Sequence, residues 1–322
     1  MYSSAPVESL LAILAAVLPV YLLMGLGGGA WRLGWFGQSG DQVLTRLAVN
    51  LFFPCLILDR VIGNERLKEA GSVAVAAGLG FGLVAGSMLL CLLAARAFGL
   101  RKGGGRRTFG LAAGLQNYGF VALPVIDALF SRETAGVMFV FNIGVELAMW
   151  TIGVGMLTGL RRAPLRLMLS PPLMAILFGL TLNFTGLDAW WPALLADTAY
   201  LAGQCAVPVA LVAIGALLFN LLGRERTSWR TAGVGVAMRC ALLPLLFLLP
   251  ALVLPLSVDL QRVLVVQAAM PAAVFSLVLA RLHGGHPQTA IEVIVATKVV
   301  SIVTTPLWIA LGLHWLGLAP VG

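Results

Sequence analysis

The sequence predicts an all-helical protein that crosses a membrane about ten times. Of its 322 residues, 60% are hydrophobic and 11% are charged, whereas about 25% of the residues in soluble domains are charged. Long apolar segments recur along the whole chain, and the short connections between them hold most of the charges. A soluble core of this size has no room for so much apolar surface, but a bilayer is itself an apolar solvent. We therefore expect an all-α polytopic membrane protein without a separate soluble domain.

Ten apolar segments are the expected membrane helices. The first is longer than the apolar part of a signal peptide and has only Glu8 as a charge before it, so we expect it to remain uncleaved. Each spanning helix needs about 20 mostly apolar residues, and ten of them account for nearly the whole chain. The expected segments are 9–30, 43–62, 71–95, 108–129, 134–158, 170–187, 196–220, 231–255, 261–282 and 289–312.

The distribution of Lys and Arg predicts how the helices are oriented. If the N-terminus lies outside, the inside connections hold fourteen basic residues and the outside connections hold five. Cytoplasmic loops of membrane proteins are enriched in Lys and Arg. We therefore expect a multi-pass protein of the bacterial cytoplasmic (inner) membrane with both termini outside. The same clustering argues against a nucleic-acid partner, despite the net charge of +8.

The positions of the prolines indicate an internal duplication. Pro54 and Pro208 each follow an amide side chain by four residues and lie 154 residues apart, and Pro124 and Pro271 lie 147 residues apart. Since each half would hold five helices, an odd number, the second half must be inverted relative to the first. Inverted repeats with proline-interrupted helices at matching positions are typical of secondary transporters. The alternative is that these are ordinary prolines of membrane helices.

The fourth segment contains the densest polar stretch, from Gln116 through Asn117, Tyr118 and Gly119 to Pro124. Proline removes a backbone donor, and carbonyl groups freed by a break must find partners in other helices or in a water-filled cavity. An unwound helix also presents half-helix ends, whose positive N-terminal dipole suits a carboxylate. We therefore predict a substrate-binding break here. The alternative is a proline kink whose amides are satisfied between helices.

The ninth segment contains the matching break, in Gln267-Ala-Ala-Met270-Pro271-Ala-Ala. Small alanines on both sides of the proline allow a second backbone to approach closely. We predict that the two broken helices cross, and that Gln267, Met270 and Pro271 contribute to the substrate site. Ordinary packing of small residues is the alternative.

Two charged residues lie near the middle of predicted spans. Glu146 follows Asn142 by four residues in the fifth segment, and Lys298 lies in the tenth. A charge at a helix centre costs about 2.5–3.5 kcal/mol on insertion scales. We therefore expect Glu146 and Lys298 to pair, at least in one transport state, with Asn142 beside them. The pair would serve ion coupling or would be purely structural.

Three further charged residues have less specific interpretations. Arg239 lies in the eighth segment, and we expect its long side chain to reach the cytoplasmic interface, as such side chains commonly do. Asp59 and Asp127 lie near the ends of spans and are expected at the interface.

The sequence lacks the usual signatures of membrane-embedded enzymes. It has no HExxH, DxxxD or GxxxxGK[ST] motif, and its three histidines lie at span ends or in loops. Metalloprotease, haem-protein, prenyltransferase and ATP-driven pump functions therefore lack their ligands or nucleotide loop. We expect a protein that is not an enzyme and needs no cofactor or metal.

Several motifs, in order along the chain, resemble the auxin efflux carrier family of the bile/arsenite/auxin carrier superfamily. They lie in the first, second, fourth, seventh, ninth and tenth segments. They are Val17-Leu18-Pro19-Val20, Phe53-Pro54-Cys55-Leu56-Ile57, Asn117-Tyr118-Gly119-Phe120 with Pro124, Ala206-Val207-Pro208-Val209-Ala210-Leu211, Met270-Pro271-Ala272 and Ser301-Ile302-Val303-Thr304-Thr305-Pro306.

This resemblance implies two inverted five-helix repeats, here residues 1–160 and 161–322, with helices 4 and 9 broken and crossed. Helices 1, 2, 6 and 7 would form a scaffold, which in relatives can dimerise, and helices 3–5 and 8–10 a moving transport domain. The expected activity is secondary, elevator-type transport of a small organic anion such as an auxin-like acid, malate or malonate. Asn117, Pro124 and Pro271 map onto the crossover.

The sequence departs from the family pattern at two places. Lys298 stands where many relatives have a hydroxyl residue, and Pro171-Pro172 stands where many have Asn-Pro. A fixed ammonium near the crossover would make sodium unnecessary. Two alternatives stay open at this point: a sodium-coupled symporter of the bile-acid type on the same fold, and a membrane receptor or enzyme without transport.

Overall fold

Helices form every regular element that a computed structural model of the chain describes. It describes residues 5–36, 40–100, 104–158, 170–221 and 228–320, without the side chains of 5–10 and 41. Within these ranges no β-strand is present. One isolated antiparallel β-bridge joins Gln116 to Ala272. The predicted all-α class is confirmed.

The first half of the chain contains long helices and one that is split. Its elements are α1 (Ala5–Arg32), α2 (Gly40–Leu47), the π-helical η1 (Ala48–Phe52), α3 (Phe53–Val61), the short 3₁₀ turn η2 (Glu65–Leu67), α4 (Ala70–Ala97), α5 (Gly104–Gly114), α6 (Ala122–Leu129), α7 (Arg132–Ala148), the π-helical η3 (Met149–Gly153) and α8 (Val154–Thr158).

The second half follows a similar order. Its elements are α9 (Pro171–Thr185), the 3₁₀ turn η5 (Leu187–Trp190), α10 (Ala193–Gln204), α11 (Ala206–Leu221), α12 (Trp229–Val236), the π-helical η6 (Ala237–Leu242), α13 (Leu243–Val253), α14 (Val258–Ala269), α15 (Phe275–Leu282) and α16 (Pro287–Leu316).

Seven helical stretches in the described part are long and apolar enough to cross a membrane. They are Leu11–Arg32, Gln42–Val61, Ala70–Ala97, Arg132–Thr158, Ala193–Leu221, Trp229–Val253 and Pro287–Leu316. They correspond to seven of the ten predicted segments. The predicted sixth segment is the shorter apolar helix α9, and the fourth and ninth are each divided into two short helices. A multi-pass membrane protein is therefore confirmed.

The two divided segments are broken in different ways. The first interruption covers residues 115–121, and Pro124 lies after it, in the first turn of α6. The expectation that Pro124 itself breaks the helix is wrong. A first-turn residue has no carbonyl partner for its N–H within the helix, so proline fits there without loss. The second interruption covers residues 270–274 and contains Pro271.

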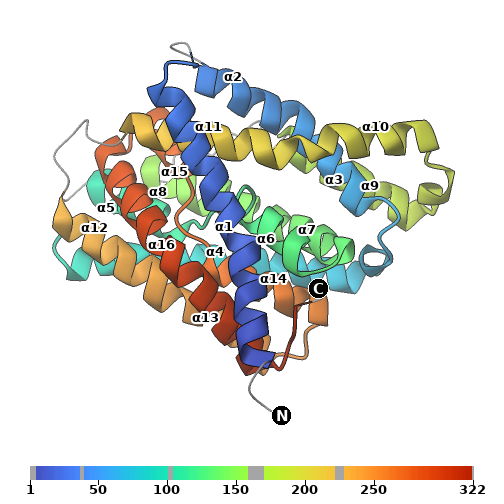
Figure 1. The fold of residues 1–322 in the computed structure, drawn as a ribbon. Coiled ribbons are helices and arrows are strands. Elements are labelled where there is room, and N and C mark those ends of the chain that lie inside the picture. The colour runs from blue at the N-terminus through green and yellow to red at the C-terminus, as the bar shows by residue number, and fades with distance from the viewer. Residues whose placement is uncertain (1–4, 37–39, 101–103, 159–169, 222–227, 321–322) are drawn as a thin grey trace.

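Glycines allow several helices to pack at backbone contact. A Cβ atom on Gly215 of α11 would collide with the carbonyl oxygen of Met24 in α1. In the same way, Gly80 of α4 faces Phe141 of α7, and Gly144 of α7 faces Ala77 of α4. Figure 1 shows α1 crossing α11 and running past α6, while α4 lies along α5 and α7. Close packing of this kind, rather than burial of apolar surface from water, holds membrane helices together.

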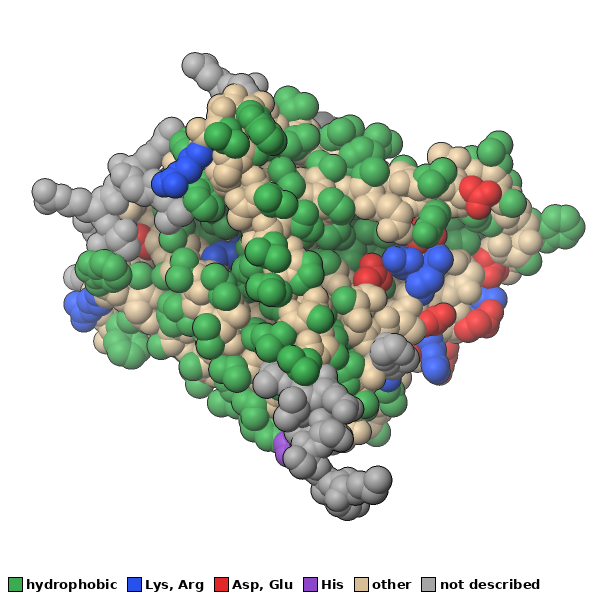
Figure 2. All heavy atoms as spheres, in the orientation of Figure 1, with side chains coloured by type: hydrophobic (Ala, Val, Ile, Leu, Met, Phe, Trp, Pro, Cys, Tyr) green, Lys and Arg blue, Asp and Glu red, His purple; other side chains and the backbone are tan. Residues whose placement is uncertain are grey.

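The face of the molecule seen in Figure 2 carries many apolar side chains. They are spread over the whole view, while Lys, Arg, Asp and Glu cluster on the right and a few basic side chains lie on the left. Leu22, Leu26 and Leu201 are among the large exposed apolar residues. Such a surface suits lipid, because exposed apolar side chains in this number along whole helices form larger patches than proteins in water usually expose.

Candidate functional site

The two interruptions meet and hydrogen-bond to each other. The backbone N–H of Asn117 donates to the carbonyl oxygen of Pro271 at 2.7 Å, and that of Ala273 donates to the carbonyl oxygen of Leu115 at 2.9 Å. These bonds satisfy polar groups that the broken helices would otherwise leave unpaired in an apolar interior. We call residues 115–121 and 270–274 the crossover.

The side chain of Gln267 holds the crossover to neighbouring helices. Its Oε1 accepts from Nε2 of Gln116 at 3.3 Å, and its own Nε2 donates to the carbonyl oxygen of Tyr118 at 3.0 Å and to Oδ1 of Asn142 at 3.4 Å. Nδ2 of Asn142 donates to the same Tyr118 carbonyl at 3.2 Å. The first interruption is thereby fixed to both α14 and α7.

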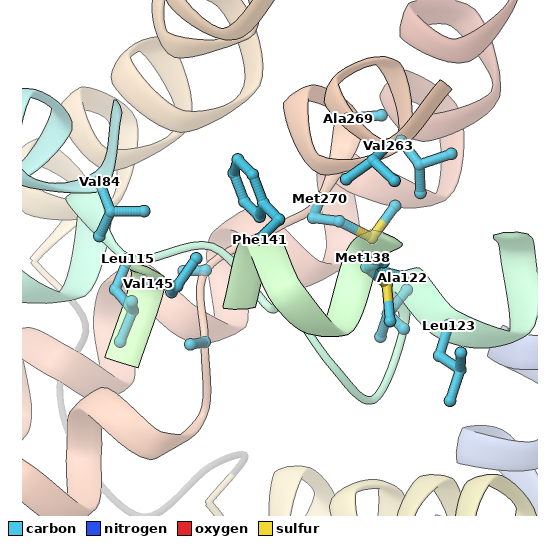
Figure 3. Packing of buried hydrophobic residues seen from close by; sticks show 14 of the residues in the cluster. Val84, Leu115, Ala122, Leu123, Met138, Phe141, Val145, Val263, Ala269 and Met270 are labelled. Atoms are coloured by element: carbon cyan, nitrogen blue, oxygen red, sulfur yellow. The ribbon is translucent and has the colours of Figure 1, made fainter. Parts of the chain in front are cut away.

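Apolar side chains pack behind this polar network. Figure 3 shows Phe141 and Met138 of α7 close to Met270, at the end of α14, with Leu115 and Val145 nearby. All five are buried. The crossover is therefore packed against α7.

A cavity of about 140 Å³ lies beside the crossover. It is lined by Val49, Phe53, Ile57, Asn117, Tyr118, Gly119, Phe120, Phe139, Asn142, Glu146, Met149, Trp150, Ser170, Pro172, Ile176, Ala273, Val274 and Phe275. Most of these side chains are apolar or aromatic, with a few polar groups, as is usual for sites that bind small organic molecules.

Half of the ten predicted site residues line this cavity, namely Asn117, Tyr118, Gly119, Asn142 and Glu146. Nδ2 of Asn117 is buried and has no hydrogen-bond partner within the described part of the chain. Asn117, one of the lining residues, therefore keeps an unpaired side-chain donor.

The other five predicted residues lie outside the cavity lining. Gln267 is buried near the end of α14, Met270 is a buried residue of the crossover itself, and the carbonyl oxygen of Pro271 accepts the hydrogen bond from the backbone N–H of Asn117. Pro124 belongs to α6. Lys298, on α16, is 4% exposed, and its Nζ has no hydrogen-bond partner among the described residues.

Glu146 and Lys298 do not form an ion pair in this conformation. Oε2 of Glu146 instead accepts a hydrogen bond at 3.1 Å from Oγ of Ser170, the residue that caps α9. Lys298 precedes Ser301 by three residues, so the two share a face of α16, and Ser301 bonds to Tyr21 of α1 at 2.8 Å. Glu146 thus faces α9 and Lys298 shares the face turned towards α1.

The interpretation of Arg239 as an interfacial side chain is wrong. Arg239 is 1% exposed and donates from Nη2 to the carbonyl oxygen of Ala268 at 3.2 Å. Sequence reasoning missed this role because the acceptor is a backbone group on another helix. It also missed Ser170, although a serine directly before Pro171-Pro172 is a recognisable start of a helix.

Several ion pairs lie at the C-terminal end of α3. Arg60 pairs with Asp59 at 3.0 Å and with Asp127 of α6 at 3.1 Å, and Arg132 of α7 pairs with Asp59 at 2.7 Å. The acidic residues expected at an interface are thus paired, and they join α3 to α6 and α7.

A further ion pair lies in the connection that follows α3. Lys68 pairs with Glu65 and with Asp188 of η5. The hydrogen bonds that Lys68 donates to Glu65 and Asp188 raise the pKa of its ammonium group. The connection after α3 is therefore tied to the turn that follows α9.

Comparison with known proteins identifies the chain. The family described as membrane transport protein matches residues 12–164 and 155–309. The chain belongs to this family. The resemblance to auxin efflux carriers, read from motifs in six segments, is thereby confirmed.

One curated relative matches over almost the full length. An uncharacterized transporter of Methanothermobacter thermautotrophicus is 28% identical over 313 residues, which cover 94% of this chain and 96% of the relative. The cavity and the crossover described above are therefore parts of a membrane transporter.

Proposed function

We propose that this transporter is a secondary carrier of a small organic anion, such as an auxin-like acid, malate or malonate, across the cytoplasmic membrane. The observation that best supports this proposal is that the cavity lies near the starts of two half-helices. Gly119 and Phe120 lie three and two residues before the first residue of α6, and Val274 and Phe275 lie at the start of α15. The N-terminal end of each helix carries a partial positive charge that favours a carboxylate.

The side chains of the cavity support the same substrate class. The free Nδ2 of Asn117 can donate a hydrogen bond to a carboxylate oxygen. Phe53, Phe139, Trp150 and Phe275 supply apolar walls for an aromatic or short aliphatic body. An amide donor and two helix ends bind an anion without a permanent positive charge in the wall, which leaves the binding weak enough for release.

Glu146 sets a condition on this proposal. It is the one charged side chain among the described residues that line the cavity, and Tyr118 is the other titratable group there. A carboxylate ligand and an ionised Glu146 would repel each other in an interior of low dielectric constant. An organic anion therefore binds together with a proton on Glu146.

The transport movement that we propose is of the elevator type, with ten spans arranged as two inverted repeats. The scaffold consists of α1, α2, α3 and α9 to α11, and the transport bundle of α4 to α8 and α12 to α16. Matching pairs of helices pack in the two halves: α4 with α7 as α12 with α16, and α1 with α11 as α9 with α3. The cavity lies between the two bundles, since Phe53 and Ile176 come from the scaffold and Asn142 from the transport bundle.

The ion pairs at the end of α3 fit this movement. They join scaffold residues Asp59 and Arg60 to Asp127 and Arg132 of the transport bundle. The cavity-lining residues of the same span, Val49, Phe53 and Ile57, precede them. With both termini outside, the ion pairs seal the outer end, and the conformation described here faces inward.

The test is uptake of radiolabelled organic acids by the purified protein in liposomes. We expect concentrative uptake of at least one of indole-3-acetate, malate and malonate, and its loss in Asn117→Ala with folding intact. Full uptake by Asn117→Ala would contradict the proposed site. Uptake that requires a sodium gradient would favour instead the sodium-coupled symporter, for which Glu146 and Asn142 supply the oxygen ligands.

A further inference from the structure

Arg239 is a buried cation with no anionic partner in the described part of the chain. It lies in the π-helical turn η6, between α12 and α13, and is the largest of the fully buried side chains there. The described ion pairs all involve other basic residues. A buried charge without compensation costs several kcal/mol, so the surroundings of the guanidinium must offset it.

The compensating groups are backbone carbonyls at the end of α14. Nη2 of Arg239 donates to the carbonyl oxygens of Ala268 at 3.2 Å and Gln267 at 3.5 Å. The guanidinium carbon lies 5.3 Å from the centre of the Phe247 ring, a distance at which cation–π attraction contributes. Nε and Nη1 have no hydrogen-bond partner among the described residues.

These carbonyls lie in the last turn of α14, which ends at the crossover, and that of Gln267 also accepts from the backbone N–H of Met270 at 3.4 Å. The last four carbonyl groups of a helix have no N–H partner within it, and together they carry a partial negative charge. The carbonyl of Ala269 accepts from Oγ1 of Thr305 at 3.0 Å, and those of Gln267 and Ala268 accept from Arg239. The guanidinium therefore supplies the positive charge at this helix end.

The corresponding end of α5 is built differently. A Cβ atom on Gly114 would lie 2.6 Å from the backbone nitrogen of Met88 and 2.9 Å from the carbonyl carbon of Ser87. The end of α5 is thus packed directly against α4. Among the described residues, a basic side chain bonds to the carbonyl end of α14, and none bonds to that of α5.

We propose that Arg239 is a tethered cation that takes the place of a free monovalent cation at the carbonyl end of α14. It positions residues 270–274 for substrate without contacting substrate itself, since it does not line the cavity. Neither sodium nor potassium is then needed at this end. For its effect on transport the inference rests on the proposed function, but the cation site itself does not.

Replacing the side chain should convert the tethered site into one that binds free cations. Arg239→Ala removes the guanidinium and leaves two carbonyl oxygens facing a vacated space. Free guanidinium, the smallest mimic of the lost group, should bind there and raise the unfolding temperature of the variant by on the order of 3 °C when its concentration is about ten times its Kd. The same addition should leave the wild type unchanged or slightly less stable, because guanidinium is a denaturant.

The experiment measures thermal unfolding of the purified protein in choline chloride, with added guanidinium chloride or sodium chloride. Arg262→Ala is the matched control. Arg262 also stacks on a phenylalanine, Phe130 at 5.2 Å, but it donates to the carboxylate of Asp259 rather than to a helix end. We expect no cation-dependent stabilisation of that variant. If Arg239→Ala is stabilised by neither cation, the inference is wrong.

Two further variants keep the test decisive if Arg239→Ala does not fold. Arg239→Lys retains the charge, and Arg239→Met has a similar length without it. We expect Arg239→Lys to retain part of the wild-type uptake rate. The uptake rate of Arg239→Met should be at least tenfold lower than that of Arg239→Lys. Equal uptake by both variants would show that the charge is not required. The unfolding measurements need no substrate, so absence of organic-acid uptake would overturn the proposed function without affecting them.

Discussion

The first prediction separates the structural role of Gln267 from the substrate-binding role proposed for Asn117. Gln267 makes three side-chain hydrogen bonds, to Gln116, Tyr118 and Asn142, in a fully buried position. The side-chain Nδ2 of Asn117 makes none within the described part, and the hydrogen bond of Asn117 to Pro271 comes from its backbone. Replacement of Gln267 should therefore cost stability, whereas replacement of Asn117 should cost substrate binding.

The magnitude follows from the groups left unpaired. Gln267→Leu keeps a similar volume but removes all three hydrogen bonds. A net hydrogen bond is worth about 1 kcal/mol, and a buried polar group left without a partner costs about 1–3 kcal/mol. Asn142 still donates to the Tyr118 carbonyl, which limits the loss. We expect destabilisation of about 2–4 kcal/mol, equivalent to a decrease in unfolding temperature of roughly 3–6 °C for a chain of this length.

The assay is thermal unfolding of detergent-purified protein, followed by the fluorescence of the eight tryptophans. Asn117→Ala serves as the control, and we expect it to unfold within about 2 °C of the wild type, because its backbone bond remains. If Gln267→Leu is as stable as Asn117→Ala, the hydrogen-bond network does not hold the crossover together. If Asn117→Ala is the less stable of the two, the assignment of the free amide to substrate is wrong.

Two further predictions concern the charges. Binding of an organic anion should strengthen as the pH falls, because protonation of Glu146 removes its repulsion of the ligand; Glu146→Gln should bind equally well at about pH 6 and about pH 8, and a wild type insensitive to pH would contradict this. Arg60→Gln removes the pairs with Asp59 and Asp127. In a protein without the native cysteines and with the reporter substitution Ile57→Cys, it should increase labelling by a membrane-impermeant maleimide added from outside about three- to tenfold. Arg262→Gln, whose pair with Asp259 lies within α14, should leave the labelling unchanged, and equal labelling in all three proteins would argue against an ion-paired outer seal.

The sequence by itself determined the class of the protein. The length and apolar character of the segments require a membrane because no soluble core of this size accommodates them. Glycine, amide and proline residues at matching positions placed the two interruptions in the fourth and ninth segments, since such residues are costly in a continuous membrane helix. These are local properties, which depend only on residues close to one another in the sequence.

The tertiary structure decided which residues meet. Glu146 and Lys298 were a plausible pair by charge alone, but Glu146 bonds to Ser170 and Lys298 lies on the face of α16 that bonds to α1. Arg239 looked like an interfacial residue, yet its acceptors are carbonyl groups of another helix. Backbone groups look alike in every sequence, and a side chain's partner depends on which face of its helix is turned inward. Both are settled only when the helices pack, and for this reason the sequence located the crossover while its supporting charges became visible only in the fold.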